Sequence, residues 1–154
     1  MSDRIRVLLI EDNPDDAELV LMELGRGGFQ VVSTRVDTAP ALEEALAEGP
    51  WDVVISDYSM PRFSGRAALE LVRAADPDVP FIMLSGTIGE DSAVDSMRAG
   101  ANDYLMKTNT VRLVPAVRRE LREAAGRRDR ARLQEQLRQS QKMEALGRLA
   151  GGVA

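Results

Sequence analysis

Short apolar segments alternate with longer amphipathic segments along most of the chain. The short segments are bounded by turn residues and predict β-strands at Ile5–Ile10, Val31–Val36, Val53–Ser56 and Phe81–Leu84. The segments between them have the helical period and predict helices at Ala17–Leu24, Ala41–Ala47, Ala67–Ala75 and Ala93–Ala99. A fifth short segment, Tyr104–Met106, precedes another helix that we expect to start near Val111.

The predicted strands are continuously apolar rather than alternating, which is typical of a parallel sheet covered by helices on both faces. Five βα units with right-handed crossovers predict an α/β doubly wound fold with a five-stranded parallel sheet. Helix signals agree: Asn13 is the expected N-cap, Pro14 occupies the first helical position, and Asp15 and Asp16 follow in the first turn. Gly25, Gly49 and Gly100 are expected just after the ends of three helices.

The chain beyond Val111 contains no further strand pattern, and a long extended C-terminal helix is expected there. Its first apolar face, with Leu113, Val117 and Leu121, would close the domain. After Glu123, arginine and glutamine dominate around a sparse apolar stripe of Leu133, Leu137, Leu146 and Leu149. We favour a two-stranded coiled coil, and hence a homodimer, over a solvated single helix. The expected division is a domain at 1–122 and a helical segment at 123–154.

Composition restricts the chemistry that this chain can perform. It has no cysteine and no histidine, so disulfides, thiolate catalysis and the commonest transition-metal ligands are excluded. Residues 1–117 carry 10 basic and 20 acidic side chains, and residues 118–154 carry 10 and 5. The basic part interleaves arginine with glutamate as a solvated helix does, so nucleic-acid binding is not expected. Without a signal peptide or an apolar stretch long enough to span a membrane, a cytoplasmic protein with no membrane contact is expected.

Polar side chains follow four of the predicted strands. Glu11 and Asp12 end the first, Asp57 ends the third, Ser85 ends the fourth and Lys107 follows the fifth. Because ligands of a doubly wound sheet bind outside the carboxyl ends of its strands, we expect these side chains to converge. Each is more often a turn or surface residue when it occurs alone. Their joint placement is what indicates a site.

Three clustered carboxylates repel one another unless a cation is present. Without histidine or cysteine ligands the cation should be hard, and Mg²⁺ suits carboxylates, water and phosphate oxygens. An aspartate beside Mg²⁺ can attack phosphorus and form an aspartyl phosphate. Mg²⁺, Lys107 and Ser85 would supply the positive charge and donors that a transferring phosphoryl group needs.

These motifs resemble the receiver domain of two-component signalling systems from about Arg4 to Leu121. The matching segments are Glu11–Asp12, Ser56–Pro61 with Gly65, Leu84–Gly86 and Gly100–Lys107. The resemblance implies a flavodoxin-like fold with strand order 2-1-3-4-5 and a phosphohistidine donor protein as partner.

The same resemblance implies a role for each matching residue. Asp57 would be the phosphoacceptor. Glu11, Asp12, Asp57 and the backbone carbonyl of Ser59 would hold Mg²⁺. Lys107 and Ser85 would bind the phosphoryl group, and Ser85 with Tyr104 would form the switch pair.

One residue departs from the receiver pattern. Receivers usually place a proline with a cis peptide bond after the lysine, whereas Thr108 follows Lys107 here. A cis bond without proline costs about 2.5–4 kcal/mol. The loop after Lys107 is therefore expected to be trans and to differ in shape from the usual one.

The C-terminal segment carries a second resemblance. Residues Gln141–Ala154 look like the start of the dimerisation helix of histidine kinases, and the alternative is an ordinary Ala/Gly-rich helix end. In that family the phosphorylated histidine follows directly after such a segment. The resemblance implies that this chain is truncated and that a histidine kinase core follows Ala154, with the receiver placed N-terminal to it.

The leading hypothesis is a phosphorylation-controlled receiver that regulates an attached histidine kinase and is not itself a turnover enzyme. One alternative is a transcriptional response regulator that lacks its output domain. The other is a Mg²⁺-dependent phosphohydrolase with an aspartyl nucleophile. Such enzymes need a second aspartate two residues after the nucleophile, and Ser59 occupies that position.

Overall fold

The computed structural model describes residues 3–86 and 89–151. The chain divides into two compact units, Met1–Leu121 and Arg122–Ala154. The first unit contains the sheet and its covering helices, and the second contains the remainder of the last helix.

The first unit is built on a five-stranded sheet whose strands are all parallel. The strands are β1 (Asp3–Ile10), β2 (Phe29–Val36), β3 (Val53–Asp57), β4 (Phe81–Ser85) and β5 (Asp103–Met106). Their order, β2-β1-β3-β4-β5, confirms the predicted doubly wound, flavodoxin-like fold. The chain order reverses beside β1, and this topology places the switch point between β1 and β3.

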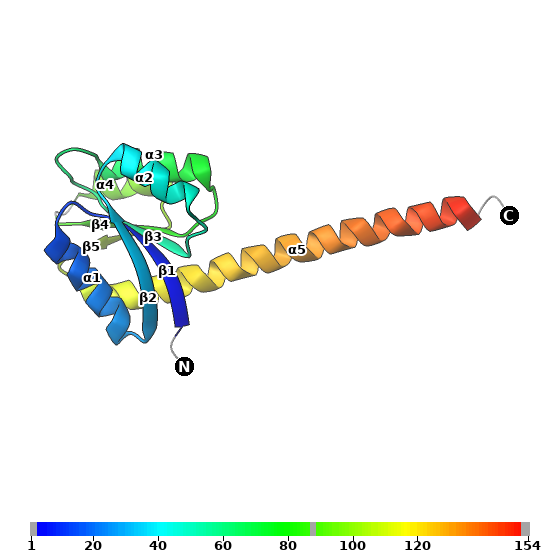
Figure 1. Cartoon of the computed structure of the whole chain (residues 1–154), viewed down its shortest axis with the longest axis horizontal. Helices are drawn as coiled ribbons and strands as arrows, with labels where there is room; N and C mark the ends of the chain where they lie inside the picture. Colours follow the sequence, from blue (N-terminus) through cyan, green and yellow to red (C-terminus); the bar gives the residue numbers. More distant parts are fainter. Residues whose placement is uncertain (1–2, 87–88, 152–154) are drawn as a thin grey trace. The chain divides into compact units, whose positions relative to one another are not determined.

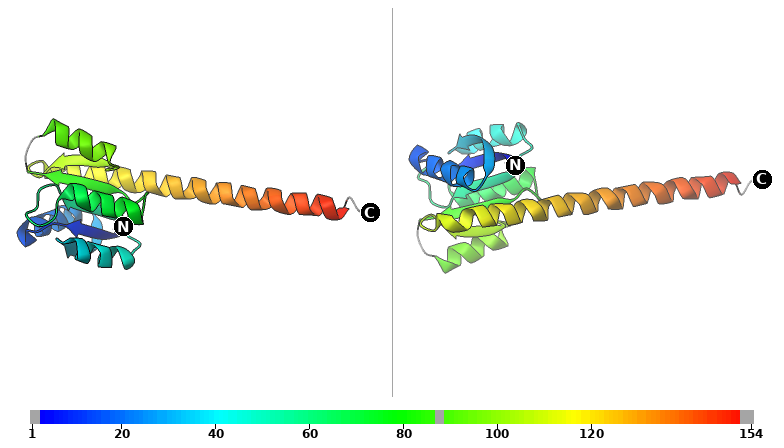
Figure 2. Two further views of the ribbon diagram at one scale, coloured as in Figure 1. Left: turned by 90° about the horizontal axis from the view of Figure 1, so that it is seen from above. Right: turned by 90° about the horizontal axis from the view of Figure 1, so that it is seen from below.

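The helices cover both faces of this sheet (Figure 1). They are α1 (Pro14–Arg26), α2 (Ala39–Ala47), α3 (Gly65–Ala75), α4 (Glu90–Arg98) and α5 (Leu113–Gly151), with a 3₁₀ turn η1 at Thr110–Arg112. Helix α1 and the first turns of α5 lie on one face, and α2, α3 and α4 lie on the other (Figures 1 and 2).

Every residue of β3 and β4 is buried, as the continuous apolar patterns predict. Successive residues of each strand point to opposite faces of the sheet and contribute to two separate cores. One contains Leu8, Val54 and Phe81 with the apolar faces of α2 and α3. The other contains Val7, Ile55 and Ile82 with those of α1 and α5. The sheet is therefore held from both sides, which fixes the positions of its strand ends.

The predicted start of α1 is confirmed in detail. The side-chain oxygen of Asn13 accepts hydrogen bonds from the backbone N–H groups of Asp15 and Asp16, at 2.9 and 3.4 Å. Pro14 is the first helical residue. These contacts satisfy donors that a helix start leaves without partners and fix the direction of the first turn.

The predicted end of α1 is wrong. The helix continues through Gly25 to Arg26, and Gly27 caps it by donating its N–H to the carbonyl of Glu23 at 3.1 Å. Gly28 then takes the positive φ of 96°. Glycine is permitted within a helix, and the tight turn needs the left-handed conformation only at Gly28, so the first glycine of the group did not mark the end.

The second unit is helical as far as the structure describes it, to Gly151. Leu133, Leu137, Met143 and Leu146 are exposed on it. Ion pairs at helical spacing, Arg132–Asp129, Arg138–Glu135 and Arg148–Glu144, support it. The side chain of Leu149 and the residues Gly152–Ala154, which complete the kinase-like segment, lie outside the described part. No described helix combines the length and apolar character of a membrane span.

Candidate functional site

The register of the sheet brings together the strand ends that the sequence singles out. Ile10 pairs with Ser56 on β3, so the next residue, Glu11, lies beside Asp57. Asp57 itself pairs with Leu84 on β4. Ser85 pairs with Met106 on β5, and the N–H of Lys107 donates to the Ser85 carbonyl at 2.8 Å. Segments from four strands therefore meet at one edge of the sheet.

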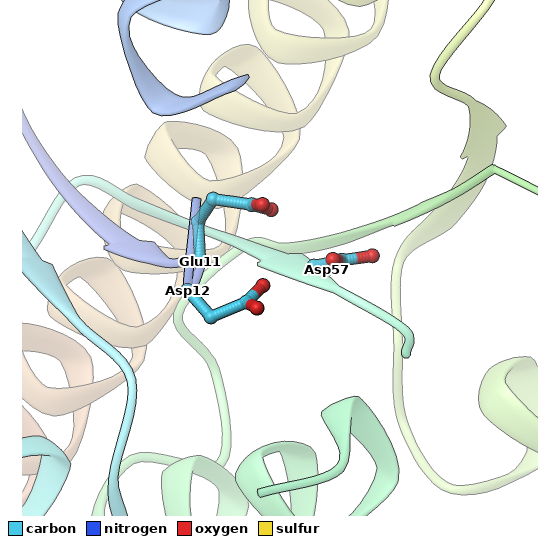
Figure 3. Close-up of side chains that lie close together, drawn as sticks. All are labelled: Glu11, Asp12 and Asp57. Atoms are coloured by element: carbon cyan, nitrogen blue, oxygen red, sulfur yellow. The ribbon is translucent and has the colours of Figure 1, made fainter. Parts of the chain in front are cut away.

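Three carboxylates lie together at this edge. One oxygen from each of Glu11, Asp12 and Asp57 lies within 4.8 Å of the others, and Figure 3 shows them around a common space at the ends of β1 and β3. Glu11 and Asp57 are each only 6% exposed, while Asp12 is half-buried. Burying several like charges is unfavourable without a counter-charge, so this arrangement favours a cation.

Lys107 supplies part of that counter-charge. Its Nζ lies 3.1 Å from Oδ2 of Asp57, 3.2 Å from Oε2 of Glu11 and 3.0 Å from Oδ2 of Asp16. Burial lowers the pKa of Lys107, but the hydrogen bonds to Asp16 and Asp57 and the charge of Glu11 outweigh it and raise that pKa above its usual value. The ammonium group therefore stays charged at neutral pH.

The same environment favours the charged form of Lys107 but disfavours the charged form of Glu11. Burial, together with the charge of Asp57, raises the pKa of Glu11 to about 7, although Lys107 acts to lower it. A raised pKa is what a cluster of carboxylates predicts in the absence of a metal ion. One positive side chain does not compensate three acids, and an added cation would favour the ionised form of Glu11.

The all-oxygen donor set fits a hard divalent cation. Carboxylate oxygens from Glu11, Asp12 and Asp57 are the ligands that Mg²⁺ prefers, and among the described residues this is the cluster close enough to hold an ion. The predicted fourth ligand, the backbone carbonyl of Ser59, lies in the loop that follows Asp57. In this loop the Ser59 N–H donates a hydrogen bond to Oδ1 of Asp57 at 3.3 Å.

The loop after Asp57 depends on Gly65. A Cβ atom at Gly65 would collide with the backbone carbonyl oxygen of Asp57 and would lie 2.8 Å from Cα of Tyr58. The N–H of Gly65 donates to the carbonyl of Tyr58 at 3.0 Å. The start of α3 therefore packs directly against the backbone of the site, which only glycine permits.

The predicted switch residues occupy neighbouring positions on β4 and β5. Met83 pairs with Tyr104, so Ser85 and Tyr104 are diagonal neighbours on one face of the sheet. The Tyr104 ring packs edge-on against Tyr58 with ring centres 6.0 Å apart. Its hydroxyl is buried and has no hydrogen-bond partner among the described residues. Tyr104 thus points into the protein beside the residue that follows Asp57.

The peptide bond between Lys107 and Thr108 is trans, as predicted. Among the described residues, the cis peptide bond is the one between Gly49 and Pro50. A turn closes it, with the Asn109 N–H donating to the carbonyl of Met106 at 3.0 Å. A small hollow opens between this loop and α1, and both Asp16 and Lys107 line it.

Two contacts of the site were not predicted from the sequence. Asp16 was assigned only to the first turn of a helix, yet it binds Lys107. The side chain of Arg35, near the end of β2, donates a hydrogen bond to the backbone carbonyl of Glu11 at 3.1 Å. This contact restrains the backbone that carries Glu11 and Asp12. Asp16 lies in the first turn of a helix that begins just after β1, and this position is the signal that could have placed it near the strand ends.

Comparison with known proteins identifies the family. Residues 7–118 match the response regulator receiver domain. The chain belongs to this family, whose members accept a phosphoryl group on an aspartate in two-component signalling.

The chain resembles both curated regulators and solved receivers. It is 41% identical over 106 residues to the transcriptional regulatory protein PrrA of Mycobacterium tuberculosis, covering 66% of this chain and 43% of PrrA. It is 38% identical over 102 residues to the response regulator protein FleR of Pseudomonas aeruginosa, covering 66% of this chain and 21% of FleR. The chain thus matches less than half the length of these relatives.

Among solved structures, a similar one is the receiver domain of a signal transduction histidine kinase from Syntrophus aciditrophicus. The TM-score is 0.66 at 27% identity, over 77% of this chain and 91% of that one. Receivers of this fold therefore occur in proteins with different outputs.

Proposed function

We propose that Asp57 of this receiver accepts a phosphoryl group from a phosphohistidine of a donor protein. The observation that carries the proposal is the convergence of Glu11, Asp12, Asp57 and Lys107 within hydrogen-bond and ligand distance at the ends of β1, β3 and β5. Asp57 is the acid that combines burial, contact with Lys107 and a central strand. An Asp57 oxygen would bond to phosphorus as the phosphorus–nitrogen bond breaks, and the imidazole would keep the electron pair and take up a proton.

The metal ion of this site is proposed to be Mg²⁺, held by Glu11, Asp12, Asp57 and the carbonyl of Ser59. When bound, it would neutralise charge on the transferring phosphoryl oxygens. Lys107, already 3.1 Å from Asp57, would bind one of these oxygens, and the Ser85 hydroxyl another. Movement of Ser85 toward the phosphoryl group would change the packing of its diagonal neighbour Tyr104 and so transmit the signal.

Beryllofluoride, which mimics an aspartyl-bound phosphoryl group, tests this assignment. With Mg²⁺ it should bind the wild type in a one-to-one ratio and should not bind Asp57→Asn in calorimetry. The matched control Asp52→Asn changes an acid at the opposite end of β3 and should bind as the wild type does. Binding that survives in Asp57→Asn would sink the assignment.

For the output, we propose that the helical segment 123–154 forms a coiled-coil homodimer and connects the receiver to a histidine kinase core. The support is the exposed stripe of Leu133, Leu137, Met143 and Leu146 on an otherwise polar helix, together with the kinase-like segment that begins at Gln141. Replacing Leu133 and Leu137 together by glutamate should shift sedimentation toward monomer. Glutamates at the exposed Gln134 and Gln136 are the control and should not.

The second candidate, a transcriptional response regulator, is favoured by one observation: PrrA, which matches this chain at 41% identity, is named a transcriptional regulatory protein. Sequencing the native gene downstream of codon 154 distinguishes the two. A histidine followed by an ATP-binding domain supports the kinase, and a DNA-binding domain supports the regulator.

A further inference from the structure

Asp16 is an acidic residue beside the site that has no place in the proposed metal or phosphoryl chemistry. It lies in the first turn of α1, where the Asn13 cap and the buried Ala17 fix the backbone on either side of it. Its Oδ2 lies 3.0 Å from Nζ of Lys107, and its side chain is 40% exposed. The contact joins residues 91 positions apart in sequence, so it depends on the packing of α1 against the sheet.

Lys107 has three carboxylate partners, and they are not equivalent. An ammonium group has three hydrogens, and Glu11, Asp16 and Asp57 each accept a hydrogen bond from it. Two of these, Glu11 and Asp57, would share their charge with a divalent cation once the site is filled. The cation would also repel the ammonium group. Asp16 is the partner whose charge would remain available to Lys107.

We propose that Asp16 is a positioning residue that holds Lys107 beside Asp57 while Mg²⁺ and the phosphoryl group occupy the site. The inference rests on the proposed function of Asp57. A lysine side chain is long and flexible, and the hollow beside Lys107, lined by Leu19, Val20 and Asn109, offers it another direction. The contact with Asp16 holds the ammonium group in a position that is also 3.1 Å from Oδ2 of Asp57.

Asp15 provides a matched control for this residue. It lies in the same first turn, its N–H is bound by the same Asn13 oxygen, and it is exposed. Within the described part of the chain it makes no ion pair with Lys107, whose partners are Glu11, Asp16 and Asp57. Asp15→Asn and Asp16→Asn therefore remove the same charge from the same helix end, and only Asp16→Asn removes the contact.

The chain offers a direct readout, because Lys107 and Lys142 are its only lysines. Protein labelled with ¹³C-lysine should give two ε-carbon signals, with the exposed Lys142 as the internal reference. Relaxation of the Lys107 signal should show a restricted side chain in the wild type and in Asp15→Asn. In Asp16→Asn it should approach the mobility of Lys142, and the change should be larger with Mg²⁺ than without it.

Binding gives the second readout. At saturating Mg²⁺, the Kd for beryllofluoride should rise about fivefold in Asp16→Asn, the size expected for a partly exposed ion pair. It should stay within about twofold in Asp15→Asn, and Asp16→Glu should recover part of the loss. The Kd for Mg²⁺ alone should not increase in Asp16→Asn, because removing Asp16 leaves the proposed metal ligands in place.

Equal Lys107 relaxation and equal beryllofluoride affinity in Asp15→Asn and Asp16→Asn would overturn the inference. A different result would contradict the proposed function of Asp57: beryllofluoride would fail to bind the wild type, or would bind Asp57→Asn equally well. In that case the relaxation of Lys107 in metal-free protein still decides whether Asp16 positions this lysine.

Discussion

The ammonium nitrogen of Lys107 lies 3.1 Å from Oδ2 of Asp57, although the two residues are 50 positions apart in the sequence. The contact crosses β4, because Asp57 ends β3 and Lys107 follows β5. It places the positive end of a long side chain against a carboxylate that is 6% exposed. Both the stability of the metal-free domain and the proposed chemistry depend on it.

Removing this positive charge should destabilise the metal-free protein. Lys107→Gln leaves Glu11 and Asp57 buried without their counter-charge, and we expect a loss of about 1–3 kcal/mol in the free energy of unfolding. The loss is smaller than for a fully buried pair because the Lys107 side chain is 23% exposed. Urea unfolding without metal measures it.

Mg²⁺ should reduce this loss, because a cation at the carboxylates replaces the missing charge. Lys142→Gln, an exposed lysine on the second unit, is the control and should change stability by less than about 0.5 kcal/mol. Equal stability of Lys107→Gln and the wild type without metal would contradict the charge balance described for the site.

Glu11 should make the stability of the metal-free protein depend on pH. Its pKa in the folded protein is about 7, above its usual value of 4.5, because burial and Asp57 disfavour the charged form. Its contribution to stability is therefore fully present below pH 4.5 and is lost as the pH rises through 7. Relative to Glu11→Gln, the wild type should lose stability between about pH 5 and pH 8 in urea unfolding.

Saturating Mg²⁺ should reverse this trend, because the cation binds the ionised form of Glu11. Without metal, the difference in unfolding free energy between wild type and Glu11→Gln could instead be the same at about pH 5 and about pH 8. That result would rule out the raised pKa of Glu11.

Gly65 should be intolerant of even one added carbon. Gly65→Ala forces a Cβ atom against the backbone of Asp57 and Tyr58, which cannot move without displacing the loop. We expect a loss of about 2–4 kcal/mol in the free energy of unfolding and weaker Mg²⁺ binding. Gly25→Ala is the contrasting control, since it lies inside α1 with no atom within 4 Å of the added carbon. It should gain about 0.5–1 kcal/mol, and similar effects of the two variants would refute the packing argument.

Tyr104→Phe should not destabilise the unphosphorylated protein. The hydroxyl of Tyr104 is buried without a partner among the described residues, so its removal relieves a desolvation cost of about 1 kcal/mol while the ring contact with Tyr58 remains. Thermal or urea unfolding should show equal or greater stability. A clear loss would mean that the hydroxyl makes a stabilising hydrogen bond in solution.

The sheet and the strand-end acids could be predicted because they follow from local patterns. Continuous apolar runs predicted buried parallel strands, and the residues after those runs, Glu11 and Asp57 among them, had to meet at one edge. The Asn13 cap and Pro14 were likewise readable from neighbouring residues. The end of α1 was not, since Gly25, Gly27 and Gly28 are all compatible with a helix end and only the backbone conformation selects among them.

The contacts of Asp16 and Arg35 could not be predicted for a different reason. Each joins a side chain to a partner on another element, Lys107 for Asp16 and the backbone carbonyl of Glu11 for Arg35. Such contacts depend on how far a side chain reaches across packed elements, which periodicity does not encode. The raised pKa of Glu11 lies between these cases, because clustering predicts a raised pKa for some acid but the sequence does not show which acid.

Mapping the phosphorylated residue tests the central claim most directly. The wild-type chain, incubated with Mg²⁺ and a small-molecule phosphodonor, should gain a single phosphoryl group that peptide mass spectrometry locates at Asp57, and Asp57→Asn should gain none. Phosphorylation at another residue, or unchanged phosphorylation of Asp57→Asn, would contradict the account.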